Sequence, residues 1–185
     1  MTSKNSPDLI SKGYRKEQER LHADPRGYGH KGRKWADHVH TLATKYGCEV
    51  ILDYGCGTNS LCEELNARGL KTRSYDPAIS ALATPPKPSD MVVSTDCLEH
   101  VEPERLEFVL SHLVALTGKI GFFVISTVET AKTLSDGRQA HISLHPREWW
   151  IAKLSERFRK VHTIDDPELK PDKQLVAFVI PKERP

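Results

Sequence analysis

Two acids and two glycines in the first half of the chain have the types and spacing of a nucleoside-binding site. Asp53 ends a short apolar run, and Gly55 and Gly57 follow it before Ser60, which has the character of a helix N-cap. Glycines at a strand end allow a sharp turn and let a ligand lie against the backbone, because they carry no Cβ. Asp76 ends the next predicted strand, where its carboxylate can accept hydrogen bonds from a ribose diol. The spacing therefore predicts one half of a nucleoside site.

The turn differs from that of a dinucleotide site, which uses a third glycine and presents a helix N-terminus to a pyrophosphate. Ser60 stands at the third position here, and Asp53 suits a cationic ligand end better than a diphosphate. The pattern Asp-x-Gly-x-Gly with a second acid after the next strand resembles the class I S-adenosylmethionine-dependent methyltransferases. The resemblance implies that Asp53 faces the amino-acid end of the cofactor, Gly55 and Gly57 pass beneath it, and Asp76 holds the ribose. The alternative is a glycine turn that binds no ligand.

The resemblance covers residues 48–181 and adds neighbouring positions to the expected cofactor site. They flank the glycine turn, follow the second strand, or follow the strand over 90–95: Tyr54, Cys56, Pro77, Thr95, Asp96 and Cys97. The pattern Asp-Gly-Arg-x-Ala-His over 136–141 is also similar to small phage and bacterial methyltransferase-like proteins.

Length and composition are those of one compact enzyme domain. The chain has 185 residues and a formal net charge of +2, which is enough chain to bury a substantial core. No run approaches the ~20 apolar residues of a membrane span, and the N-terminus lacks the apolar segment of a secretory signal. The four cysteines include no Cys-x-x-Cys pair, so neither zinc nor a disulfide framework is predicted. We expect a cytoplasmic protein and leave its oligomeric state open.

Hydrophobic periodicity predicts an α/β fold with a Rossmann-like, mainly parallel sheet that ends in an antiparallel hairpin. Residues 1–12 are expected to be a disordered tail, and 13–185 a single domain with a helical, basic segment over 13–47 and the core over 48–185. Strands are expected at 50–54, 71–75, 90–95, 119–127, 159–165 and 174–180, and helices at 33–46, at 61–68 and after Pro103 and Pro146. The resemblance implies the strand order two, one, four, five, seven, six in the numbering of the family.

One strand of the family pattern is predicted to be missing. Only residues 77–89 separate the second strand from the next buried one, and they include Ala-Thr-Pro-Pro-Lys-Pro-Ser. Proline cannot donate to a central ladder, so this segment is expected to be a loop. In the family that this sequence resembles, an acid on that third strand commonly binds adenine. We expect this acid to be absent here.

The acceptor side of the site is expected in the segment 128–145. It follows a predicted strand, and ligands of open parallel sheets bind beyond the carboxyl ends of the strands. Asp136 and His141 in this segment, and His100 in the stretch Leu-Glu-His-Val, are the candidate catalytic residues. His141 is equally consistent with a structural tether, and His100 with a wall of the pocket. We expect the segment to be mobile without ligand, to hinge at Gly137, and to order over the acceptor.

The histidines are also candidate metal ligands. His141 and His145 are four residues apart and His100 precedes them, but a His-x-x-x-His pattern in a loop lacks the helical phasing that makes such spacing meaningful. The sequence therefore predicts no metal site.

The function predicted from these patterns is an S-adenosylmethionine-dependent methyltransferase that acts on oxygen or nitrogen of a small polar molecule, such as a saccharide, nucleotide or metabolite. Two alternatives remain. A nucleic-acid methyltransferase is supported by the basic segment 25–34, but the strand exit Ser94-Thr-Asp-Cys lacks an Asn-Pro-Pro-Tyr-like motif. A non-catalytic nucleoside-binding protein is the other alternative, because the fold is reduced.

Overall fold

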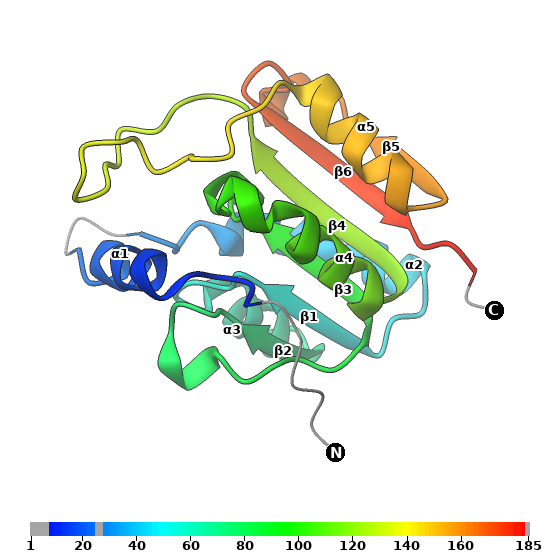
Figure 1. The fold of residues 1–185 in the computed structure, drawn as a ribbon. Coiled ribbons are helices and arrows are strands. Elements are labelled where there is room, and N and C mark those ends of the chain that lie inside the picture. Colours follow the sequence, from blue (N-terminus) through cyan, green and yellow to red (C-terminus); the bar gives the residue numbers. More distant parts are fainter. Residues whose placement is uncertain (1–7, 25–27, 184–185) are drawn as a thin grey trace.

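The computed structural model describes residues 8–24 and 28–183, which form a six-stranded sheet with helices on both faces (Figure 1). The sheet order is β2-β1-β3-β4-β6-β5. The strands are β1 Val50–Tyr54, β2 Lys71–Tyr75, β3 Ser89–Thr95, β4 Thr117–Ser126, β5 Lys160–Thr163 and β6 Gln174–Ile180. The first four strands pair in parallel, and β6 is antiparallel to both β4 and β5. The predicted fold class and strand order are confirmed.

Alternating residues of the central strands build a hydrophobic core on each side of the sheet. Leu52, Val92 and Phe123 pack with helices α4 (Leu106–Leu116) and α5 (Arg147–Arg157). Their chain neighbours Ile51, Met91 and Phe122 point to the other face and pack with α2 (Ala36–Lys45) and α3 (Ser60–Ala67). Strands buried on both faces read as continuous apolar runs, which is why the sequence located them so closely.

The third strand of the family pattern is absent, as predicted. Between β2 and β3 the structure has a single short 3-10 turn, Ser80–Leu82, followed by the proline-rich loop. Other 3-10 turns lie at Gly32–Trp35, Leu98–His100, Pro103–Arg105 and Pro167–Leu169. The predicted helix over 33–46 therefore begins as a 3-10 turn that continues into α2.

The start of α3 differs from the prediction. Asn59, not Ser60, is the N-cap, and it has a left-handed backbone with φ of +65° and no side-chain cap hydrogen bond. The Ser60 hydroxyl instead donates to the backbone carbonyl of His30, at 3.1 Å. The Ser60 side chain, which the local pattern assigned to capping, therefore makes a tertiary hydrogen bond instead.

The expected disordered tail over 1–12 is described only from residue 8. Residues 1–7 lie outside the described residues, but Leu9 packs against the main core and Ser11 caps helix α1 (Lys12–His22). Helix α1 lies beside the strand ends rather than on a sheet face (Figure 1). It buries Tyr14 and Leu21 against Leu134 and Ala140 of the loop 128–145 in a small separate core. We call α1, residues 28–34 and the loop 128–145 the cover.

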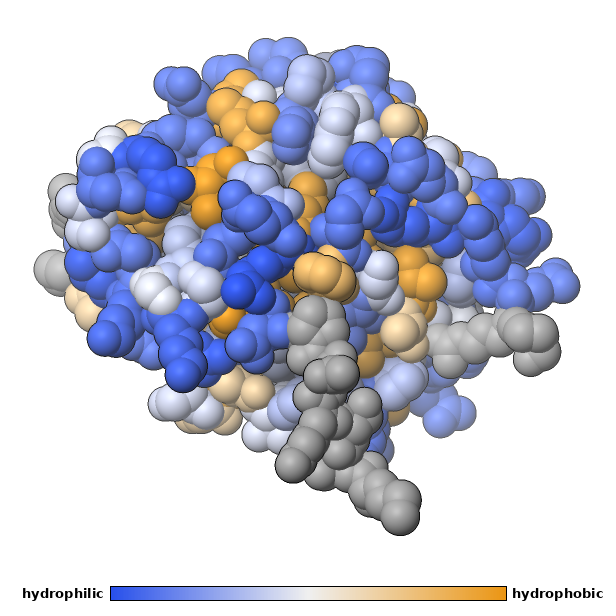
Figure 2. Space-filling view, in the orientation of Figure 1, coloured by the Kyte–Doolittle hydropathy of each residue, from blue (hydrophilic) through white to orange (hydrophobic). Residues whose placement is uncertain are grey.

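None of the described helices is long and apolar enough to span a membrane. On the face that carries α4 and α5, hydrophilic residues dominate and apolar residues emerge in small groups between them (Figure 2).

Candidate active site

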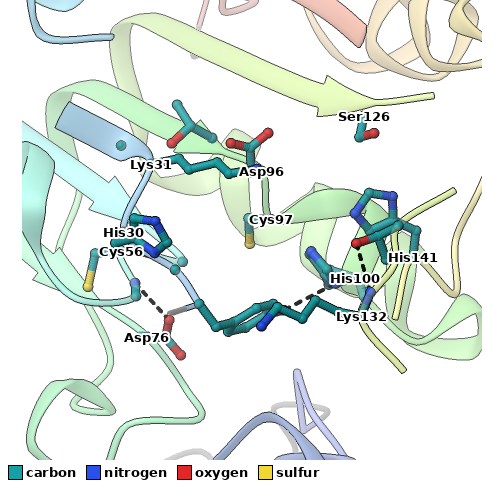
Figure 3. A pocket seen from close by; sticks show the side chains of 18 of the residues that line it. His30, Lys31, Cys56, Asp76, Asp96, Cys97, His100, Ser126, Lys132 and His141 are labelled. Atoms are coloured by element: carbon teal, nitrogen blue, oxygen red, sulfur yellow. Dashed lines mark hydrogen bonds between the residues drawn. The ribbon is translucent and has the colours of Figure 1, made fainter. Parts of the chain in front are cut away.

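A cavity of about 870 Å³ lies between the carboxyl ends of the parallel strands and the cover. Its floor is formed by residues that end or follow β1, β2 and β3. Its other walls come mainly from the cover, with contributions from α2, α4 and the segment 168–174 that leads into β6. Figure 3 shows this arrangement, with Asp76 and Cys56 at one end of the cavity and His100 and His141 at the other. This is where an open parallel sheet binds its ligands.

Every residue that the sequence analysis placed in the cofactor site lines this cavity. They are Asp53, Tyr54, Gly55, Cys56, Gly57, Asp76, Pro77, Thr95, Asp96 and Cys97. Asp96 adopts φ of +50°, which is uncommon for a residue with a side chain. Such backbone geometry is concentrated at functional sites.

Two backbone amides hold the Asp76 carboxylate in place. Gly57 N donates to one oxygen at 3.1 Å, and Ala78 N donates to the other at 2.9 Å. On the cover side, His22 Nε2 lies 4.0 Å from the same carboxylate. Burial lowers the pKa of His22, although the nearby Asp76 charge acts in the opposite direction. The carboxylate is thus oriented by the turn after β1 while remaining on the cavity wall.

Asp53 is a buried acid without a cationic partner. The residue is 3% exposed, and the Cys62 thiol donates a long hydrogen bond to it, with Sγ 4.0 Å from Oδ2. Among the described residues no lysine, arginine or histidine forms an ion pair with it. Burial, reinforced by the Asp76 charge, raises the pKa of Asp53 to about 7. A cationic ligand group in the cavity would stabilise its ionised form, so the residue fits the amino-acid end of S-adenosylmethionine.

The glycines of the turn are required for a reason that the sequence analysis missed. Gly55 and Gly57 have φ of +77° and +52°. A Cβ on Gly55 would lie 2.2 Å from Cys97 Sγ, and one on Gly57 would lie 2.4 Å from the carbonyl oxygen of Gly29. The position that a Cβ would take on each glycine is therefore occupied by the chain itself, although both glycines still line the cavity. The glycines let the turn pack against β3 and against the cover.

Two histidines present an unprotonated nitrogen to the cavity region. His100 Nδ1 lies 2.8 Å from the carbonyl oxygen of Ala140, and His141 Nδ1 lies 2.7 Å from that of Val128. A carbonyl oxygen only accepts, so each Nδ1 carries the proton and each Nε2 keeps its lone pair. Burial lowers the pKa of both rings, that of His100 to about 3. The ring centroids are 4.7 Å apart in an edge-to-face arrangement.

Asp136, the third catalytic candidate, does not lie with His100 and His141. Asp136 does not line the cavity, and it forms an ion pair with Arg138, with an N–O distance of 2.7 Å. Its hydrogen bonds to Arg138 lower the pKa of the carboxyl group. The structure therefore places the Asp136 carboxylate outside the cavity lining, away from His100 and His141.

Sequence reasoning missed the contribution of the N-terminal segment. Tyr14, Gln18 and His22 of α1 and Tyr28 after it line the cavity, whereas the sequence analysis placed no site residue in this region. The signal was present in the spacing of Tyr14, Gln18 and Leu21, which are buried on one helix face. Lys31 and Lys34 of the predicted basic segment also line the cavity, while residues 25–27 lie outside the described residues.

Comparison with protein families gives one match that spans most of the chain. The family described as a methyltransferase domain matches residues 28–170. The comparison with curated proteins finds no matching sequence. The chain belongs to the methyltransferase domain family, as the sequence resemblance implied.

Solved structures with the same fold include proteins described as methyltransferases and a complex with S-adenosylhomocysteine. The DhpI complex with S-adenosylhomocysteine is 20% identical, with a TM-score of 0.61, and the match covers 95% of this chain and all of that one. The Burkholderia thailandensis 1,6-didemethyltoxoflavin-N1-methyltransferase is 15% identical, with a TM-score of 0.65 and coverage of 97% and 93%. The N-methyltransferase NodS from Bradyrhizobium japonicum is 16% identical, with a TM-score of 0.57 and coverage of 92% and 99%. The fold is that of the class I S-adenosylmethionine-dependent methyltransferases.

Proposed function

We propose that this methyltransferase domain binds S-adenosylmethionine and transfers its methyl group to oxygen or nitrogen of a small polar molecule. The observation that carries the proposal is that the buried acids of the predicted cofactor site and two neutral histidines line one cavity. Its volume of about 870 Å³ is in the range of cofactor and small-ligand sites, roughly 300–1,000 Å³.

Asp53, Gly55, Gly57 and Asp76 would hold the cofactor. Asp53 would pair with the cationic amino-acid end, which accounts for a buried carboxylate without a cationic partner among the described residues. Asp76, already oriented by two amides, accepts from the ribose hydroxyls. When bound, S-adenosylmethionine supplies an electrophilic methyl group on a sulfonium centre. Four solved structures of the same fold were obtained with S-adenosylhomocysteine or S-adenosylmethionine by their own descriptions, which supports this choice.

His100 and His141 would face the acceptor. They lie at the end of the cavity opposite Asp76 (Figure 3), and each keeps an unprotonated Nε2. Methyl transfer depends largely on alignment of the nucleophile, so residues that orient the acceptor can supply much of the rate. Asp136 has no part in this proposal because it lies outside the cavity lining.

The charge of the cavity supports a small polar acceptor more than a nucleic acid. Among the described lining residues, Lys31, Lys34, Lys132, Lys170 and Lys173 are balanced by Asp53, Asp76, Asp96, Glu102, Glu129 and Glu168. Nucleic-acid sites carry a clear excess of positive charge. Two solved structures of this fold name a small molecule in their descriptions, one with bound 1,6-didemethyltoxoflavin and one as a mitomycin 7-O-methyltransferase.

Calorimetry with S-adenosylmethionine, S-adenosylhomocysteine and NAD tests the cofactor assignment. We expect both adenosyl compounds to bind and NAD to bind more weakly, whereas a preference for NAD would contradict the proposal. Incubation with labelled cofactor and fractionated extract then tests the acceptor. Label in small polar compounds supports the proposal, label in nucleic acid supports the alternative substrate, and binding without transfer indicates a non-catalytic protein.

A further inference from the structure

A group of three potential metal ligands lies at the histidine end of the cavity. Glu99 and His100 belong to the 3-10 turn that follows β3, and His141 comes from the loop after β4. One ligand atom from each of the three lies within 4.8 Å of the other two. The sequence separates His141 from the pair by some forty positions, so only the fold brings the group together.

Glu99 is an acid with an unused buried oxygen. The residue is 0% exposed, and its Oε1 accepts a hydrogen bond from Ser126 N at 3.0 Å. Its Oε2 is buried and has no hydrogen-bond partner among the described residues. A buried carboxylate oxygen without a partner is costly, and such groups usually coordinate a ligand or a metal. The backbone of Glu99 is fixed, because its carbonyl accepts from Ser143 N at 2.9 Å.

The two histidines have the hydrogen bonds that prepare an imidazole for metal binding. In metal sites the ring nitrogen that does not bind the metal usually donates to a carbonyl or carboxylate, which fixes the tautomer and the ring orientation. His100 Nδ1 donates to Ala140 and His141 Nδ1 donates to Val128, at 2.8 and 2.7 Å. Nε2 of each ring is therefore the atom left to coordinate.

We propose that Glu99, His100 and His141 bind a divalent transition-metal ion through one carboxylate oxygen and the two Nε2 atoms. Two imidazoles and one carboxylate favour ions such as Mn²⁺, Fe²⁺, Co²⁺ or Zn²⁺, whereas Mg²⁺ and Ca²⁺ favour oxygen ligands. Ligands at about 2.1 Å from an ion lie roughly 3 Å from one another, so the group closes by about 1–2 Å on binding. His141, in the loop of the cover, is the ligand best placed to make that movement.

Three protein ligands leave coordination positions open, as in catalytic metal sites. His100 and His141 line the cavity, so an open position faces the place where the proposed function puts the acceptor. An oxygen of the acceptor would bind there, which narrows the acceptor to molecules with a metal-binding oxygen. This second step depends on the proposed function, but the metal site itself does not.

The test is a titration of the chelator-treated full chain with Mn²⁺, Co²⁺ or Zn²⁺, in the absence of cofactor and acceptor. We expect one ion to bind per chain, and the absorption spectrum of the Co²⁺ form to report nitrogen ligands. Glu99→Gln and His141→Ala should each weaken binding at least about tenfold, which is the usual scale for disturbing a metal site. Circular dichroism confirms that each variant is folded.

His145→Ala is the matched control. His145 lies four residues from His141 in the same loop but stacks on Trp149, with ring centroids 3.7 Å apart. It belongs to no group of potential metal ligands among the described residues. It should bind the ion like the native chain. Equal losses in His141→Ala and His145→Ala, or no one-to-one binding of any of the three ions, would overturn the metal site. Calorimetry with S-adenosylmethionine is run on the same samples, so failure of the metal site and failure of the proposed function are observed separately.

Discussion

The two halves of the cavity are built in different ways. The cofactor half consists of short turns at the ends of β1, β2 and β3, whose residues lie within a few positions of a buried strand. The segments of the cover, which are distant in the sequence, are held to one another by contacts between them. Arg20 of α1 donates to the carbonyl of Thr133 at 2.7 Å, and Ser135 N donates to Glu17 at 2.8 Å. The cover therefore has a small core and polar contacts of its own.

The difference shows what kind of information each half requires. A strand end fixes the position of the next two or three residues, so residue types and spacing suffice to locate Asp53 and Asp76. The position of His141 depends on where a long loop packs. That packing is decided by Leu134 and Ala140 against α1, more than a hundred residues earlier in the chain.

The largest effect is expected where the two halves touch. Gly57→Ala would place a Cβ 2.4 Å from the carbonyl oxygen of Gly29, at φ of +52°. Left-handed strain and overpacking against backbone should together cost roughly 2–5 kcal/mol of unfolding free energy. Urea unfolding measures it. Affinity for S-adenosylmethionine should fall as well, because Gly57 N also donates to Asp76.

Gly69→Ala separates the backbone strain from the overpacking. Gly69 has φ of +82° but nothing within 4 Å of an added Cβ. It should lose only about 1–2 kcal/mol, the cost of the left-handed backbone. If Gly57→Ala and Gly69→Ala lose the same unfolding free energy, the close contact of Gly57 with Gly29 contributes nothing to the loss in Gly57→Ala.

A smaller effect, confined to binding, is expected at Asp76. Asp76→Ala should weaken S-adenosylmethionine binding by about 1–3 kcal/mol, because the ribose hydroxyls lose their acceptor. His141→Ala, in the other half, should change cofactor affinity by no more than about threefold while it reduces turnover. Calorimetry and a labelled-methyl assay measure the two quantities. The division between the halves is wrong if His141→Ala lowers cofactor affinity as much as Asp76→Ala does.

The buried acid of the cofactor half should also give stability a pH dependence. The pKa of Asp53 is raised to about 7 in the folded chain by burial, so the folded state binds more protons than the unfolded state between about pH 4 and 7. Stability should therefore fall as pH rises through that window, by up to about 1.4 kcal/mol per pH unit, and level off above it. Glu99, whose pKa burial raises to about 8, contributes with the same sign.

The difference between native chain and Asp53→Asn isolates the contribution of Asp53, measured as urea midpoints across that pH range. Asp136→Asn is the comparison from the cover. The pKa of Asp136 is lowered by Arg138, so any stabilisation it gives is present at neutral pH and is lost only as pH falls toward its folded value. An unchanged slope in Asp53→Asn would show that this carboxylate is not held neutral by burial.

Much of the fold could be predicted from the sequence because its signals are local. The strand over 50–54 has the predicted bounds, and the prolines between 83 and 88 exclude a third strand. The failures share one cause. Ser60 bonds to His30 instead of capping α3, and Asp136 pairs with Arg138 instead of reaching the cavity. In each case a partner outside the motif decides what the side chain does, and no periodicity in the sequence reveals that partner.

Glu99 is another residue whose partner lies outside its own motif. The spacing of the histidines alone predicted no metal site. Glu99 follows β3 like the cofactor residues, but its partner His141 belongs to the cover. The proposed metal site therefore lies where the two halves meet, and neither half alone predicts it.

The smallest effect on overall stability is expected inside the cover. Leu134 is 3% exposed and packs in the small core with Tyr14 and Leu21. Leu134→Ala should loosen the loop without unfolding the sheet, because a satellite core can open separately from the main one. Hydrogen exchange should accelerate at Leu134 N and Ala140 N, which donate within the loop at 2.8 Å, and remain unchanged in β3 and β4. The urea midpoint should move by less than the equivalent of about 0.5 kcal/mol.

Leu65→Ala, in the main core beneath α3, is the matched change. Leu65 is 0% exposed and packs against the sheet, so its truncation should cost about 2–5 kcal/mol and accelerate exchange throughout the sheet. Addition of S-adenosylmethionine should slow exchange in the loop of the Leu134→Ala variant, because a ligand in the cavity gives the cover a second surface to pack on. If Leu134→Ala lowers the urea midpoint as far as Leu65→Ala, the cover is part of the main folding unit. The loop 128–145 would then be a fixed wall of the cavity rather than a segment that closes over the acceptor.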